Sequence, residues 1–167
     1  MQKKGGVFLV DLGMGLILEA AEGAWLEWLV LGLLAWFVLC HGVARFGGWT
    51  KLSGPYSLLG GFSGRRLFLQ TILLERGVRY GNTMTLGVSH QGLYLAPLFV
   101  LRPGHPPLLI PWEEISVEDK KGFFGHTLEM RFSRVPGVTL TLGYATGKQL
   151  AEWAGEYWPG QRWEWSL

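Results

Sequence analysis

The chain has 167 residues, of which 49% are hydrophobic and 17% charged, with a formal net charge of +2 and a mean hydropathy of +0.20. It is more apolar than a soluble domain of this size usually is, so a membrane segment is expected. Its single cysteine, Cys40, excludes an internal disulfide and a cysteine-based zinc cage.

The first segment, residues 1–23, is predicted to be an amphipathic helix. Its apolar run over residues 7–18 is interrupted by Asp11 and is too short to cross a bilayer. The polar or small residues at helical spacing are Asp11, Gly15, Glu19 and Glu22. One such stripe is typical of a helix at the membrane interface or against a partner. A cleaved signal peptide is the alternative, which Asp11 disfavours, and whether the segment spans the membrane or lies on it stays open.

Residues 24–46 are predicted to form a transmembrane helix. Within them, residues 28–44 read WLVLGLLAWFVLCHGVA, seventeen residues without a formal charge if His41 is neutral. This length is at the short end of the roughly 17–25 residues that a spanning helix needs. A buried helix of a soluble protein is the alternative. The tryptophans expected to anchor the span at the two membrane surfaces are Trp25, Trp28, Trp36 and Trp49.

The basic residues around the span predict its orientation. They are Lys3 and Lys4 before it and Arg45, Lys51, Arg65 and Arg66 after it. Because basic residues concentrate on the cytoplasmic side, we expect a single-pass protein whose C-terminal part is cytoplasmic.

Residues 47–64 are predicted to be a juxtamembrane helix followed by a linker. Trp49, Leu52 and Tyr56 share one helical face that would rest on the membrane surface or on the next domain. The Gly-rich tract that ends at Gly64 is typical of a linker.

From residue 65 the pattern becomes that of β-strands. Strand-length segments rich in β-branched and aromatic residues, separated by turn residues, cover residues 65–75, 83–89, 92–101, 108–119, 126–133 and 138–144. Residues 147–158 then predict an amphipathic helix that Thr146 would cap and Pro159 would stop. The fold class is therefore α+β behind a transmembrane helix.

The segments TLGVSHQGLYLAPLF and HPPLLIPWEEI carry a family resemblance. With Gly92 at the turn of a hairpin, they resemble the pleckstrin-homology-like (PH-like) superfold, including its bacterial and GRAM-type members. They also resemble a group of single-pass bacterial membrane proteins that share an HPPLLIPW motif. The resemblance covers residues 65–158. It implies an antiparallel PH-like barrel or sandwich capped by one C-terminal helix, in a protein of the bacterial inner (cytoplasmic) membrane.

Residues 104–115, GHPPLLIPWEEI, contain the strongest candidates for chemistry. A histidine near two carboxylates could act in acid–base catalysis or bind a metal. On a strand, however, the adjacent Glu113 and Glu114 face opposite sides, and Pro111 favours an edge strand or a bulge. We therefore interpret the stretch as a stiff turn entering a buried strand, with His105 a turn histidine. A small hydrolase or metal enzyme using His105 remains a third functional hypothesis.

Lys120 and Lys121 are the weak candidates for binding an anionic lipid headgroup, because they occupy a predicted loop between strands. The adjacent Glu118 and Asp119 favour a solvated turn instead.

Aromatic residues near the C-terminus are the candidates for binding a partner. They are Trp153, Tyr157, Trp158, Trp163 and Trp165, and residues 159–167 form an aromatic tail. Exposed aromatics are typical docking anchors, although the tail could instead fold back over its own domain. We expect a non-enzymatic accessory or assembly subunit that docks on other membrane-protein subunits, without cofactor, metal or nucleic acid. An adaptor that binds anionic lipid is the alternative.

Overall fold

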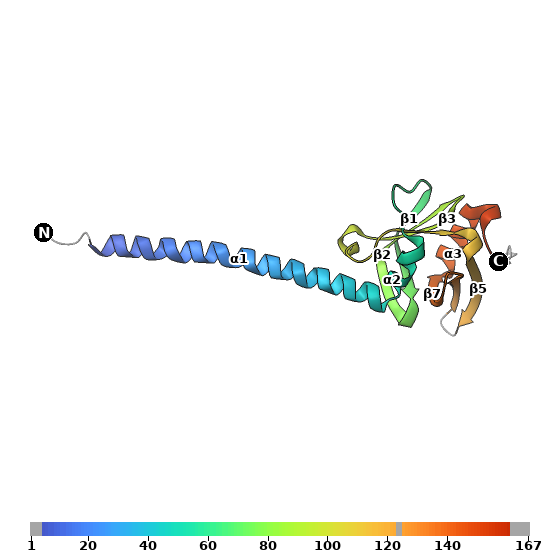
Figure 1. Cartoon of the computed structure of the whole chain (residues 1–167), viewed down its shortest axis with the longest axis horizontal. Coiled ribbons are helices and arrows are strands. Elements are labelled where there is room, and N and C mark those ends of the chain that lie inside the picture. The colour runs from blue at the N-terminus through green and yellow to red at the C-terminus, as the bar shows by residue number, and fades with distance from the viewer. Residues whose placement is uncertain (1–4, 123–124, 161–167) are drawn as a thin grey trace. The chain divides into compact units, whose positions relative to one another are not determined.

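The computed structural model describes residues 5–122 and 125–160 (Figure 1). The chain divides into two compact units, Met1–Leu39 and Cys40–Leu167. The described residues of the first unit are helical, and the second unit contains every strand that the structure describes.

Helix α1, Gly5–Phe46, is one continuous helix of 42 residues. The expected division between residues 1–23 and 24–46 is absent, because the sequence contains no proline there and isolated glycines weaken a helix without ending it. Its segment Trp25–Phe46, with 22 residues and a mean hydropathy of 1.9, is long and apolar enough to cross a membrane. At 1.5 Å per residue it spans about 33 Å, against a hydrocarbon core of about 30 Å. Signal sequences share these properties of length and composition.

Helix α2, Trp49–Tyr56, belongs to the core of the second unit. Its predicted apolar face is buried, since Trp49 and Leu52 are fully inaccessible and Tyr56 is 3% exposed. The compact unit begins at Cys40 and therefore includes α2.

Seven antiparallel strands form one sheet in the order β4-β3-β2-β1-β7-β6-β5. The strands are β1 Arg65–Leu74, β2 Val78–Ser89, β3 Gly92–Pro97, β4 Leu108–Pro111, β5 Ile115–Gly122, β6 Gly125–Phe132 and β7 Val135–Gly143. Three short 3-10 helices follow strands, η1 Glu75–Gly77, η2 Phe99–Leu101 and η3 Trp112–Glu114, and a fourth, η4 Gly155–Tyr157, follows helix α3. Helix α3, Tyr144–Ala154, follows the last strand, so the predicted α+β class is confirmed.

Two predicted strands are shorter than expected. The segment 92–101 leaves the sheet at Pro97 and continues as η2, and the segment 108–119 is divided by η3. Pro111 explains the division, because its missing N–H ends the ladder of β4. β4 lies at the edge of the sheet, as the proline predicted.

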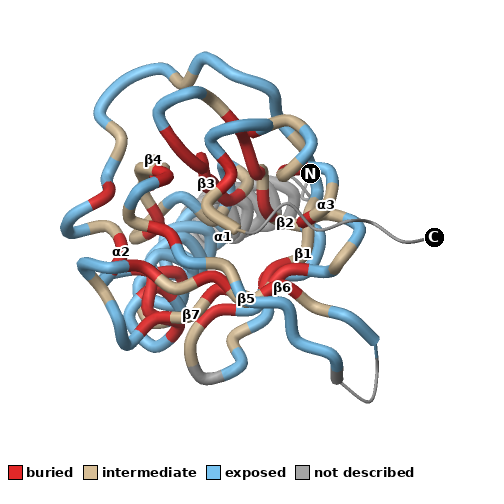
Figure 2. The backbone as a smooth tube through the Cα atoms, turned by 90° about the vertical axis from the view of Figure 1, so that its right-hand side faces the viewer, coloured by how far each residue is buried: buried red, intermediate tan, exposed pale blue. Residues whose placement is uncertain are grey.

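The predicted alternation of buried and more exposed residues holds in β6 and β7, whereas all six residues of β3 are buried. Leu128, Met130 and Phe132 of β6 are buried, as are alternate residues of β7. Buried residues gather along the strands and α2 in Figure 2. Helix α3 approaches this core closely, because a Cβ atom at Gly147 would overlap the side chain of Leu128. The helix begins at Tyr144, before the expected cap; Thr146 instead donates a 2.8 Å hydrogen bond from Oγ1 to Oε1 of Gln70.

Candidate functional site

Three of the four expected anchor tryptophans lie exposed on α1. Trp25, Trp28 and Trp36 are 54%, 75% and 41% exposed. Trp49 is instead fully buried, and its Nε1 donates a 3.0 Å hydrogen bond to the carbonyl of Pro106. Trp49 is therefore a core residue of the second unit.

The last two turns of α1 are built into the second unit. Cys40 and Ala44, one helical turn apart, are 2% and 1% exposed. Gly104 has a φ of +75°, and a Cβ atom there would lie 3.1 Å from the Cα of His41 and 3.3 Å from the Cβ of Ala44. The loop around Gly104 thus lies directly against the C-terminal end of α1.

His105, the strongest candidate for chemistry, is buried next to this junction with 1% exposure. Its Nδ1 lies 3.2 Å from the carbonyl oxygen of Pro103 and its Nε2 lies 2.9 Å from the hydroxyl oxygen of Tyr80. Because a carbonyl can only accept, Nδ1 carries the proton and Nε2 accepts from the tyrosine. The rings of Trp49 and Tyr80 pack at 5.5 and 5.6 Å from the imidazole.

Burial sets the ionisation of both hydrogen-bonded groups. Desolvation lowers the pKa of His105 below its usual range and raises the pKa of Tyr80 to about 12. Both side chains are therefore neutral at neutral pH. This arrangement supports a structural role for His105 as the anchor of its turn.

The two glutamates of the motif lie on η3. Glu114 accepts a 2.8 Å hydrogen bond from the hydroxyl of Tyr56 and pairs with Arg134. Partial desolvation raises the pKa of Glu114, but the hydrogen bonds from Tyr56 and Arg134 outweigh it, so that the pKa is lowered. Glu114 thus joins α2 to the β6–β7 turn. No group of three or more metal-binding side chains occurs in the described part of the chain.

Trp112 of the same motif is a core residue. Its indole is 5% exposed, and Nε1 donates a 2.8 Å hydrogen bond to the carbonyl of Ser89. Its ring lies 5.9 Å from that of Trp158, which is 8% exposed. Trp158, a candidate for binding a partner, therefore packs inside its own domain.

The other aromatic candidates are dispersed. Tyr157 is 47% exposed on η4, whereas Trp153 is partly buried with the guanidinium carbon of Arg65 5.6 Å from its ring centroid. Trp163 and Trp165 lie outside the described residues.

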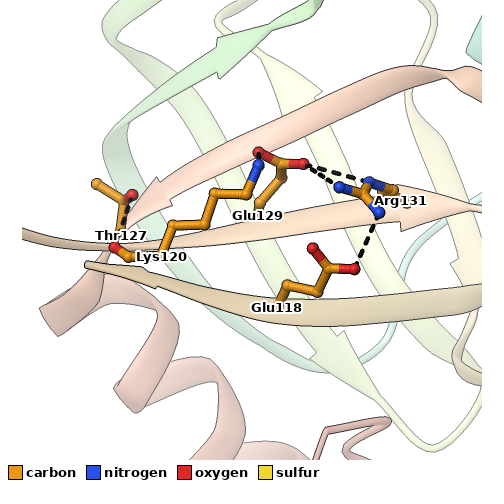
Figure 3. Close-up of polar contacts among 5 residues, drawn as sticks. All are labelled: Glu118, Lys120, Thr127, Glu129 and Arg131. Atoms are coloured by element: carbon orange, nitrogen blue, oxygen red, sulfur yellow. Dashed lines mark hydrogen bonds and ion pairs between the residues drawn. The ribbon is translucent and has the colours of Figure 1, made fainter. Parts of the chain in front are cut away.

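The lysines proposed for lipid binding lie on β5, not in a loop. Figure 3 shows Lys120 ion-paired with Glu129 of β6, whose carboxylate also accepts two hydrogen bonds from Arg131. Arg131 in turn reaches Glu118 at 2.9 Å. The hydrogen bond from Lys120 is the main reason that the pKa of Glu129 is lowered. The ammonium group of Lys120 is therefore paired with Glu129, while Lys121 is exposed.

A bulge in β1 forms a site that the sequence analysis missed. The register between β1 and β2 shifts between Leu67 and Gln70 and again before Ile72. Two non-glycine residues here have left-handed backbone, Leu69 with a φ of 56° and Asn82 of β2 with a φ of 51°. Asparagine tolerates this conformation, but for leucine it costs about 1–2 kcal/mol.

The bulge exposes two consecutive apolar side chains. In a regular strand Phe68 and Leu69 would face opposite sides of the sheet, yet they are 61% and 57% exposed. Thr71 of β1 binds Asn82 of β2 through two hydrogen bonds. Its Oγ1 donates to Oδ1 of Asn82 and accepts from the Asn82 backbone N–H, both at 3.0 Å. The run of three consecutive apolar residues, Leu67 to Leu69, was the available sequence signal.

Leu69 lines an open groove of about 450 Å³ between β1 and β7. The groove forms because β1 pairs with β7 only at Ile72 and Leu73. It combines apolar side chains, hydroxyl groups and one cation; its lining residues are Leu69, Gln70, Thr71, Leu73, Arg79, Asn82, Thr127, Thr141, Leu142, Gly143 and Thr146.

The chain thus joins a helix long and apolar enough to span a membrane to an α+β unit with a seven-stranded antiparallel sheet. A scan against protein-family models finds no match, and a search of curated proteins finds no matching relative.

Proposed function

We propose that the protein is a non-enzymatic accessory or assembly subunit of a bacterial membrane-protein complex. It crosses the cytoplasmic membrane once through the apolar part of α1 and holds a PH-like domain on the cytoplasmic side, where the domain docks on another subunit. The observation that carries this proposal is the strained β1 bulge, which presents Phe68 and Leu69 beside the groove.

The architecture supports the PH-like assignment and the anchoring. Antiparallel strands followed by one helix, α3, agree with the coarse arrangement that the resemblance implies, although the strands form one open sheet that ends at β4 and β5. The burial of Cys40 and Ala44 against the domain supports a module held close to the membrane surface, where a neighbouring membrane protein is within reach. The basic residues after the span, Arg45 first, support the cytoplasmic orientation.

Strain at Leu69 favours a role in binding. A left-handed leucine is disfavoured by about 1–2 kcal/mol relative to an ordinary strand residue, and exposing its side chain to water offsets none of this. Such outliers cluster at ligand-binding sites, where the displayed side chain gains its contacts only in the complex. The groove beside it, with apolar walls and Arg79, suits a partner segment that combines an apolar residue and a carboxylate.

The two alternative functions have less support. Binding of anionic lipid by Lys120 would require breaking its ion pair with Glu129. Hydrolysis or metal catalysis by His105 would require exposing a side chain that is 1% accessible and hydrogen-bonded at both nitrogens.

The test compares variants of the full-length protein purified from native membranes in mild detergent. Leu69→Asp should reduce the recovery of the partner subunit by about tenfold or more, as loss of a central apolar contact commonly does. Leu59→Asp is the matched control, because Leu59 is 97% exposed and does not line the groove. Equal recovery with both variants would contradict the proposal.

A second variant separates binding from folding. Glycine adopts a positive φ without strain, so Leu69→Gly should leave thermal stability unchanged or raised while it weakens partner recovery. If Leu69→Gly instead lowers the melting temperature and keeps the partner, Leu69 serves the fold and not docking.

A further inference from the structure

The 3-10 helix η2, between β3 and β4, is a second exposed apolar feature. The chain reads Leu-Phe-Val-Leu over residues 98–101, and no residue of η2 is buried. Phe99 is 77% exposed and Val100 is 46% exposed. Exposure of consecutive apolar side chains to water is unfavourable. Such a run outside the core is therefore typical of a surface that binds a partner or a membrane.

The same loop lies against the end of the apolar helix. Gly104, three residues after η2, approaches the Cα of His41 and the Cβ of Ala44. Both of these residues belong to Trp25–Phe46, the segment with the length and composition of a span. The loop therefore lies beside the C-terminal end of that segment.

Hydrogen bonds fix both ends of the loop. The N–H of Leu98 donates to the carbonyl of Thr83 at 2.8 Å, before η2. After η2, the N–H of His105 donates to the carbonyl of Arg102 at 2.8 Å, and the His105 side chain is held by Tyr80. Since its ends are fixed, η2 presents its apolar side chains with little further loss of conformational entropy on binding.

We infer that η2 inserts Phe99 and Val100 into the interface of the same lipid bilayer that α1 crosses. Aromatic and aliphatic side chains partition favourably into this region. The exposed Arg102 follows directly, where a guanidinium reaches lipid phosphates while its aliphatic part stays in the apolar layer. The inference rests on the membrane anchoring in the proposed function. This inference gives the start of the HPPLLIPW motif a structural role. The hydrogen bonds from Tyr80 to His105 and from Trp49 to Pro106 hold the C-terminal end of the loop that carries η2.

The test places a nitroxide spin label at single cysteines of the full-length protein in vesicles of zwitterionic and anionic phospholipid. Cys40, the single native cysteine, is replaced in a Cys40→Ala background. Labels are attached in Phe99→Cys, Val100→Cys, Leu33→Cys and Tyr157→Cys, and their collisions with oxygen and with a water-soluble nickel chelate are compared. Leu33 reports the span, and Tyr157, an exposed aromatic on η4, is the matched control.

Insertion predicts that the labels at residues 99 and 100 collide more with oxygen than with nickel, as the label at residue 33 does, while the label at 157 shows the reverse. If residue 33 is in lipid but residues 99 and 100 behave like 157, the inference fails and the anchoring stands. If residue 33 is itself exposed to nickel, the anchoring fails. Protection of residues 99 and 100 from both reagents would indicate a protein contact, such as a second copy, and would overturn the inference.

Discussion

Removal of the His105 imidazole should destabilise the protein substantially, because the ring is a buried structural element. In His105→Ala, the hydroxyl of Tyr80, a residue 4% exposed, loses its partner. An unsatisfied buried polar group costs about 1–3 kcal/mol, and truncation of a packed ring adds a cavity. We expect a total loss of about 2–5 kcal/mol, a large part of the 5–15 kcal/mol that holds a typical domain together.

The measurement is denaturant unfolding of the full-length protein in detergent micelles, followed by near-ultraviolet circular dichroism. His90→Ala is the matched control, because His90 is exposed in the β2–β3 turn and should change stability by less than about 0.5 kcal/mol. Adding Tyr80→Phe to His105→Ala removes the orphaned hydroxyl and should restore about 1–3 kcal/mol. Equal unfolding midpoints for His105→Ala and His90→Ala would refute the structural role.

The pH dependence gives an independent check. The pKa of His105 is lowered by burial from its ordinary value of 6.5, so below that pH the unfolded chain binds a proton that the folded chain does not. Wild-type stability should therefore fall as the pH falls below 6.5, towards the lowered pKa. His105→Gln should show a shallower decrease over that range; an unchanged pH profile would contradict the assignment.

Three further predictions concern the rest of the molecule. Trp112→Ala should lower the free energy of unfolding by about 3–5 kcal/mol, because the indole is 5% exposed and hydrogen-bonded; a silent variant would contradict its core position. The pKa of Glu129 is lowered from 4.5, so the stabilisation that its ionised carboxylate gives the folded state is present above that pH and is lost as the pH falls through the lowered pKa. Glu129→Gln should therefore reduce the decrease in the free energy of unfolding at acid pH, by less than about 1 kcal/mol. A C-terminal tag should resist protease added to spheroplasts, and digestion of the tag would reverse the proposed orientation.

The periodic patterns in the sequence predicted most of the elements. Residues 28–44 indicated an apolar helix, and alternation in residues 128–132 and 138–142 indicated which strand faces are buried. Pro111 predicted an edge strand, because a residue without an N–H interrupts the ladder of a central strand. These features are local, since they depend on the spacing of side chains along a single helix or strand.

The sites depend on contacts between residues distant in sequence. The helical spacing of Trp49 left open whether it faces the membrane or the next domain, and no local pattern shows that Tyr80 meets His105 twenty-five residues later. From the sequence we interpreted His105 as a turn histidine, but its burial follows from packing against α2 and β2. Likewise the exposure of Phe68 follows from a register shift against β2, which alternation within β1 alone cannot predict.

The sequence by itself therefore determined an apolar helix followed by an α+β domain. Only the tertiary structure decided where the domain begins and which apolar side chains remain outside its core. The physical reason is that burial is a property of the assembled sheet. Pairing between strands sets the register, and the register decides whether a leucine such as Leu69 faces the core or the solvent.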